Sequence, residues 1–231
     1  MFIPIKDDQQ TSRTSHLTIA LIFVNTAVFL YSQSLGGQGF SQLMVTLGFT
    51  PHYYLDMGSN YIVPGWYYLT PVTSMFLHGG WGHLIGNMLF LWIYGNNVED
   101  YFGRAKFVLF YVVSGLAAIT LYTLFSPGSE VPLVGASGAI AGVMGAYMVL
   151  HPKAQITVLI LFIFIMIRQF PAKVVLGIWF GYQILMSLVG SSTGGGVAWM
   201  AHVGGFIFGY LVMKGILLLR GKPHRAHRVR W

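Results

Sequence analysis

The sequence contains no cysteine, which excludes disulfide bonds, thiolate nucleophiles and thiolate metal sites. Charged residues are also scarce, since Asp, Glu, Lys and Arg together make up 8% of the 231 residues, against about 25% in ordinary soluble domains. Only six residues are acidic, and all of them lie in expected loops or at the ends of apolar runs. A two-carboxylate aspartyl mechanism therefore has no candidate pair inside those runs.

Apolar residues dominate what is present, at 55% of the chain. Several long apolar runs predict a polytopic membrane protein folded as one compact bundle. We expect an all-α fold with six transmembrane helices, at residues 17–31, 82–97, 105–125, 137–150, 172–188 and 197–219. The fourth run has only about 14 residues, too few to cross a hydrocarbon core of about 30 Å. We therefore expect the preceding loop to dip into the bundle and to carry Ser137 below the membrane surface.

The basic residues are clustered along the chain, although the formal net charge of +7 could suggest a nucleic-acid partner. None of the 13 Lys and Arg falls within 14–103, 107–152 or 174–213. Such clustering is typical of the positive-inside rule and argues against nucleic-acid binding. It predicts that both termini and all the basic residues are cytoplasmic.

The charge map also divides the chain. We expect a short cytoplasmic arm at residues 1–15, a membrane domain at 16–219 and a basic cytoplasmic tail at 220–231. The tail is read either as lying on an anionic leaflet or as a stop-transfer flank.

Three other segments carry expectations of their own. Residues 33–81 lack Lys and Arg and are rich in aromatics, which predicts a structured first outer loop at the membrane interface. Residues 156–167 are apolar but too few to span, so we expect a re-entrant or interfacial segment, either helix or hairpin. Residues 190–196 are rich in glycine and serine, and we expect a mobile outer loop.

Polar residues inside the apolar runs are the candidates for chemistry. His83 and Asn87 are four residues apart, so they share one helix face about 6 Å apart along the axis. The topology puts them at a similar depth to Ser137 and His202, on the outer side. A polar side chain facing lipid is expensive, so all four should face the interior. Interhelical hydrogen bonding is the alternative explanation, but two imidazoles and a serine at one depth favour a site.

Small residues support this grouping. Gly138 and Gly142 form one small-residue face, and Gly205 and Gly209 form another. If the two helices touch along these faces, His202 comes within reach of Ser137. A serine with a histidine base needs only their hydrogen bond and donors for an oxyanion.

A zinc site is the competing interpretation of the histidines. The sequence has no His-Glu-x-x-His, no thiol and no acidic residue in the core of a span. We therefore expect no metal and no cofactor. We expect His78 alone to be interfacial or structural.

These motifs together resemble the rhomboid family of intramembrane serine proteases. The resemblance covers nearly the whole chain and rests on four patterns: His83-x-x-x-Asn87, Glu99-x-x-x-Gly103-x-x-x-Phe107, Gly135-Ala-Ser137-Gly138 and Ala201-His202-x-x-Gly205-x-x-x-Gly209. It implies a six-helix bundle that hydrolyses peptide bonds in or near transmembrane segments of other proteins.

The resemblance also implies roles for single residues. Ser137 would be the nucleophile and His202 its general base, in a dyad without an acid. His83, Asn87 and the Ser137 backbone N–H would hold the oxyanion. Gly135 would be the glycine of the serine loop, the segment that leads directly into Ser137. Many relatives carry an aromatic residue four positions after the serine, stacked on the base, where this chain has Ala141. The first outer loop also lacks the Arg of a Trp-Arg pair found in some relatives.

Two other functions stay open at this point. A non-catalytic rhomboid-like protein that binds membrane proteins for quality control is the alternative, although such relatives usually lose the serine or the histidine. A small transporter would show repeats and broken helices in matching positions, and we find neither. The expected partners are transmembrane substrates and the lipid bilayer. The expected location is the bacterial inner membrane as a multi-pass protein, with the site toward the outer side.

Overall fold

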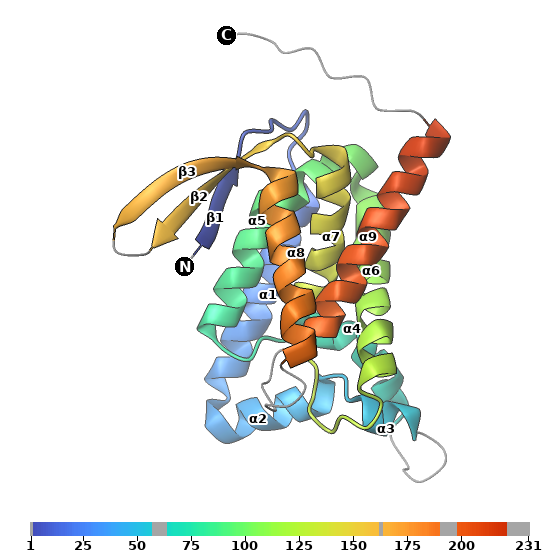
Figure 1. Cartoon of the computed structure of the whole chain (residues 1–231). Helices are drawn as coiled ribbons and strands as arrows, with labels where there is room; N and C mark the ends of the chain where they lie inside the picture. The colour runs from blue at the N-terminus through green and yellow to red at the C-terminus, as the bar shows by residue number, and fades with distance from the viewer. Residues whose placement is uncertain (1, 57–63, 162–163, 190–197, 221–231) are drawn as a thin grey trace.

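The computed structural model describes residues 2–56, 64–161, 164–189 and 198–220, and its helices form a bundle (Figure 1). The expected mobile loop at 190–196 lies outside this part of the chain. The six apolar runs each overlap one helix: α1 (His16–Ser34), α5 (Trp81–Phe102), α6 (Arg104–Phe125), α7 (Ser137–Leu150), α8 (Ala172–Val189) and α9 (Trp199–Arg220). The helical fold class is thereby confirmed.

Four of these helices are long and apolar enough to cross a membrane, namely α1, α6, α8 and α9. The helix α7 has 14 residues, as its apolar run predicted. The helix α5 has 22 residues, but it ends in a polar stretch that includes Asn97, Glu99 and Asp100. The count of six spans therefore stays a prediction, whereas the membrane bundle does not depend on it.

The centre of the bundle is α7, which contacts α5, α6, α8 and α9. Its residues from Gly138 to Tyr147 are all buried. A helix that is apolar on every side belongs in a core, because it has no polar face to turn outward. The helix α7 begins at Ser137, and the residues on either side of it, Ala136 and Gly138, are buried, so the start of this helix lies inside the bundle.

The connection between α1 and α5, which was expected to be a structured first outer loop, is structured in its described residues. It contains α2 (Gly36–Leu47), α3 (Pro51–Leu55), η1 (Gly65–Leu69), α4 (Thr70–Thr73) and η2 (Ser74–Phe76). Pro51 and Pro71 lie in the first turn of their helices, where a missing N–H costs nothing. Phe49, Tyr67 and Met75 are buried, which fixes the loop against the bundle.

A three-stranded antiparallel sheet lies at the end of the bundle away from α2 and α3 (Figure 1). A hairpin at 156–167 was one of the two expected forms, but the sequence did not predict a third strand. The strands β2 (Gln155–Leu161) and β3 (Ile165–Pro171) form a hairpin in the segment expected to be re-entrant or interfacial. The strand β1 (Phe2–Asp7) pairs with the free edge of β2, so the sheet order is β1-β2-β3. The expected arm at 1–15 thus begins as a strand. Ile156, Val158 and Ile160 of β2 are buried, which explains why this apolar segment stays at the bundle.

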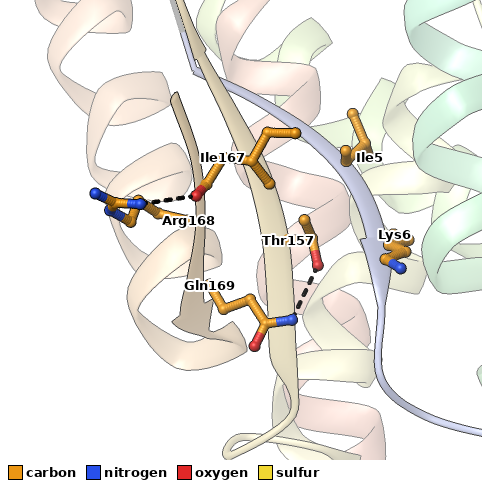
Figure 2. A pocket seen from close by; sticks show the side chains of 6 residues that line it. All are labelled: Ile5, Lys6, Thr157, Ile167, Arg168 and Gln169. Carbon is orange, nitrogen blue, oxygen red and sulfur yellow. Dashed lines mark hydrogen bonds between the residues drawn. The ribbon is translucent and has the colours of Figure 1, made fainter. Parts of the chain in front are cut away.

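The sheet carries a surface cavity of about 520 Å³, shown in Figure 2. Across it, Gln169 Nε2 donates to Thr157 Oγ1 at 3.4 Å, while the Arg168 guanidinium points away and donates to the Ile167 carbonyl. The remaining lining residues are Ile5 and Lys6. None of the candidate site residues lines this cavity, so it is separate from the predicted site.

Carboxylates organise the sheet end of the bundle. Glu99 is buried and accepts the Leu17 and Thr18 backbone N–H groups at 3.0 and 2.7 Å. It therefore satisfies two of the unpaired donors at the start of α1. Asp7 accepts from Asn97 Nδ2 at 2.9 Å and from the Tyr147 hydroxyl, which ties β1 to both α5 and α7.

Candidate active site

The loop before Ser137 is held inside the bundle by backbone hydrogen bonds. Phe49 and Leu133 pair as an antiparallel bridge, and Gly135 N donates to Ser74 O at 2.9 Å. Gly135 has φ +123°, a conformation that glycine adopts readily. The helix α7 begins at Ser137, so the Ser137 N–H is one of the four that lack a partner within the helix. This N–H lies at the positive end of the helix dipole.

Ser137 and His202 are in hydrogen-bond contact, because Ser137 Oγ lies 2.8 Å from His202 Nε2. Close approach of α7 and α9 makes this contact possible. A Cβ added at Gly205 would collide with the Gly138 carbonyl oxygen, and one at Gly209 would collide with the Gly142 carbonyl oxygen. The two small-residue faces therefore lie where the helices cross.

The glycines of α7 itself serve a second contact. A Cβ at Gly138 would lie 2.6 Å from the Ala118 Cβ, and one at Gly142 would collide with Ser114, both on α6. The helix α7 is thus packed closely against α6 and α9 at once, which is why it carries small residues on two sides.

The surroundings of His202 include a residue that the sequence motifs did not single out. Gln183 on α8 has its Oε1 2.7 Å from His202 Nδ1 and is 4% exposed. In the sequence, this contact was indicated only by the position of Gln183 in an apolar helix, where an amide needs a polar partner. Aromatic support for the imidazole also comes from outside α7. The ring centroids of Trp179 and Trp199 lie 6.0 and 6.3 Å from that of His202, whereas Ala141 offers no ring.

His83 and Asn87 differ in how they meet the serine loop. The His83 ring lies against Gly135, where an added Cβ would be only 2.6 Å from His83 Nε2. Asn87 Nδ2 instead donates to the His83 carbonyl oxygen of its own helix at 2.8 Å. Asn87 Oδ1 is buried without a hydrogen-bond partner in the described part of the chain. The His83 ring is thus in close contact with the serine loop, whereas the Asn87 amide nitrogen is bonded within α5.

A small cavity of about 20 Å³ adjoins Ser137. That volume holds about one water molecule. The wall contains polar atoms of Ser74 and Ser137, and small residues form much of the rest, namely Gly115, Ala118, Gly135, Gly138, Ala139 and Ala201. The site can therefore accommodate a water or a small side chain next to the hydroxyl.

His78, in the connection before α5, is fully buried and packs edge-on against the His83 ring at 5.1 Å between centroids. Burial and, to a smaller extent, the neighbouring His83 together lower the pKa of His78 to about 4. His78 is therefore neutral at physiological pH. Within the described residues, no three His, Asp or Glu side chains are grouped as metal ligands would be.

Known proteins are similar in sequence to this chain over long stretches. The family model of the rhomboid domain matches residues 65–219. Rhomboid protein 1, mitochondrial, of Saccharomyces cerevisiae is 30% identical over 206 residues, which cover 85% of this chain and 52% of the yeast protein. Rhomboid protease GluP of Bacillus subtilis is 32% identical over 131 residues, covering 57% of this chain and 24% of GluP.

The putative rhomboid protease YdcA of Bacillus subtilis is 29% identical over 141 residues, which cover 61% of this chain and 63% of YdcA. The chain spans about half the length of the yeast relative and about a quarter of GluP. Because the matched region runs from η1 into α9 and contains both Ser137 and His202, the chain is an integral membrane protein that belongs to the rhomboid family.

Proposed function

We propose that the protein is an intramembrane serine endopeptidase that cleaves peptide bonds in or beside transmembrane segments of other membrane proteins. The observation that carries this proposal is the 2.8 Å contact between Ser137 Oγ and His202 Nε2 inside an apolar bundle. A serine hydroxyl becomes a strong nucleophile only when a base within hydrogen-bond reach can take its proton. The named rhomboid proteases among the relatives support the same activity.

The reaction would follow the serine hydrolase sequence. Neutral His202 takes the Ser137 proton as the oxygen attacks the substrate carbonyl carbon, and His202 then gives that proton to the leaving amine. The Ser137 N–H and His83 would hold the oxyanion. Asn87 would join them once its amide turns away from the His83 carbonyl. Water then attacks the acyl-enzyme with His202 again acting as base, releasing the second product and restoring Ser137.

The site geometry also suggests which substrates fit. A helical substrate hides its carbonyls in backbone hydrogen bonds, so the segment must unwind locally before Ser137 can reach one. The cavity beside Ser137 has a volume of only about 20 Å³, and its lining includes three glycines and three alanines beside Met75, Ile119, Leu133 and Val134. We therefore propose that a small side chain occupies the position next to the cleaved bond. The partners are thus transmembrane proteins with a helix-breaking, small-residue stretch, presented within the bilayer.

We propose that both termini are cytoplasmic and that the site opens toward the outer side. The clustered Lys and Arg residues support this orientation through the positive-inside rule. The relatives come from a bacterium, a fungus and a plant, and the bacterial inner membrane is our proposed location.

The test uses the purified protein in detergent micelles with a model transmembrane substrate and a fluorophosphonate probe. We expect wild type to cleave the substrate and to be labelled at Ser137, and we expect Ser137→Ala to lose both properties. General-base catalysis contributes on the order of 10²- to 10⁴-fold, so His202→Ala should lose at least 100-fold in cleavage rate. If Ser137→Ala cleaved as fast as wild type, the proposal would be wrong.

The alternative is a non-catalytic factor that binds membrane proteins for quality control. One observation favours it, namely that the Asn87 amide is bonded to its own helix rather than directed at the serine loop. The intact Ser137–His202 contact argues against it. Stable co-purification of uncleaved membrane proteins with wild type, together with no labelling of Ser137, would support this alternative.

A further inference from the structure

We propose that Gln183 is the positioning residue for His202. Its amide oxygen accepts the N–H at His202 Nδ1 and so leaves the Nε2 lone pair directed at Ser137. This inference rests on the proposed serine protease function. It assigns to α8 a part in the chemistry that neither the sequence motifs nor the family relationship pointed to.

The three side chains form a continuous hydrogen-bonded line. Gln183 Oε1 lies 2.7 Å from His202 Nδ1, and His202 Nε2 lies 2.8 Å from Ser137 Oγ. A neutral imidazole has one N–H donor and one acceptor nitrogen, and the partner of one nitrogen decides the state of the other. An acceptor at Nδ1 therefore selects the tautomer whose Nε2 can take a proton.

The surroundings make this selection necessary. Gln183 is 4% exposed, so its amide must bond within the protein or bear the cost of burial without a partner. The Trp179 ring, one turn earlier on α8, lies 6.0 Å from the imidazole, and Trp199 faces it edge-on at 6.3 Å. Ala141 is fully buried and carries no ring. The helix α8 thus supplies the hydrogen bond through Gln183 and one of the two aromatic contacts to His202, while Trp199 of α9 supplies the other.

An amide suits this position better than a carboxylate would. A buried charge in the membrane is expensive, whereas a neutral carbonyl oxygen selects the tautomer without that cost. The carboxylate of a serine protease triad also stabilises the imidazolium that forms during reaction. Gln183 is therefore expected to orient the base while giving less stabilisation to its charged form.

The experiment compares Gln183→Met and Gln183→Glu with wild type and with Ser187→Ala. Methionine preserves the length of the side chain but removes the acceptor, while glutamate keeps an oxygen that can accept the same N–H. Ser187 lies on the same helix, and among the residues that the structure describes its hydroxyl donates only to the Ile184 carbonyl oxygen. We expect Gln183→Met to lower kcat by roughly 10- to 100-fold, the range for loss of an outer partner that orients an imidazole, with little change in KM. We expect Gln183→Glu to recover most of that loss and Ser187→Ala to match wild type.

A spectroscopic readout separates orientation from general damage. In 15N-labelled wild type, the His202 resonances should report a proton on Nδ1 and none on Nε2. In Gln183→Met they should report a mixture of tautomers, with an unchanged thermal midpoint for unfolding. A wild-type proton on Nε2, or a Gln183→Met variant with wild-type kcat, would overturn the proposal.

The outcomes for this inference and for the proposed function remain distinguishable. If wild type neither cleaves substrate nor labels at Ser137, the protease function fails, and the tautomer of His202 still tests the role of Gln183. If Gln183→Met does not fold, the wild-type spectrum and the Gln183→Glu kinetics decide. A Gln183→Glu variant that folds and is as slow as His202→Ala would count against Gln183 as an acceptor.

Discussion

Gly135 combines an unusual backbone conformation with a close contact to His83. Its φ of +123° is rarely adopted by other residues, and a Cβ there would lie 2.6 Å from His83 Nε2. Gly135→Ala must therefore strain the loop and displace the ring. We expect stability to fall by about 1–3 kcal/mol and cleavage to fall by at least tenfold, measured by thermal unfolding and by kcat/KM on a transmembrane substrate.

Gly128 provides the matched control for this change. It lies in the same connection between α6 and α7, and a Cβ there would meet no atom within 4 Å. Gly128→Ala should cleave substrate at the wild-type rate. Equal activity of Gly135→Ala and Gly128→Ala would mean that catalysis does not need His83 against the serine loop.

At the residue scale, the sequence predicted best where several patterns agreed. Ser137 and His202 could be paired because their positions, the charge map and the glycine faces all indicated one depth on one side of the membrane. Gln183 could not be paired, because a single amide in an apolar helix does not reveal which neighbour it meets. The orientation of the Asn87 amide depends on a local hydrogen bond to the His83 carbonyl, which spacing alone does not indicate.

At the scale of elements, the crossing of α7 and α9 depends on the absence of side chains. A Cβ at Gly209 would collide with backbone atoms of Gly142, and backbone cannot move aside as a side-chain end can. Forcing extra atoms into a packed core typically costs about 1–3 kcal/mol. We expect Gly209→Ala to lower the thermal midpoint clearly and to weaken cleavage by widening the gap between His202 and Ser137.

Gly215→Ala is the control on the same helix, since a Cβ there meets no atom within 4 Å. Alanine is a better helix former than glycine by up to about 1 kcal/mol, so this variant should be as stable as wild type or slightly more stable. A Gly209→Ala protein that melts and cleaves like Gly215→Ala would show that the crossing tolerates a wider spacing.

The helices were predictable as elements and the sheet was not. Long apolar runs identify helices because the lipid leaves few other ways to pair backbone groups. The strand β2 is buried at Ile156, Thr157 and Val158 in succession, so it lacks the alternating pattern that identifies a half-exposed strand. Its partner β1 (Phe2–Asp7) is separated from β2 (Gln155–Leu161) by most of the helical bundle in the sequence. Local composition cannot predict a pairing between segments so far apart in the chain.

At the scale of the whole molecule, Asp7 links the N-terminal strand to the core of the bundle. Burial raises the pKa of the Asp7 carboxyl above its usual value, although the bonds from Tyr147 and Asn97 oppose this effect. The folded state therefore holds the Asp7 proton to a higher pH than the unfolded state does. This contribution to stability is complete below the usual Asp pKa of about 3.9 and is lost as pH rises through the raised value.

Asp7→Asn removes this titration. We compare the thermal midpoint of Asp7→Asn with that of wild type at each pH. The difference, variant minus wild type, should rise as pH increases from about 3.9, because only wild type loses this contribution, and should level off above the raised pKa of Asp7. Thermal unfolding in detergent across a pH series measures this difference. The matched variant is Asp56→Asn, which makes the same chemical change at the opposite end of the bundle. A difference for Asp7→Asn that stays flat or falls with pH would contradict the prediction.

The pairing of β1 with β2 also constrains the order in which the protein is made. Asp7 leaves the ribosome 140 positions before its partner Tyr147, and β2 comes directly after α7. The strand β1 must therefore wait, unpaired, while the ribosome delivers four helices of the bundle, namely α1, α5, α6 and α7. The sheet can close only after α7, the helix that carries Ser137, has been synthesised, so β1 docks after these helices have been made.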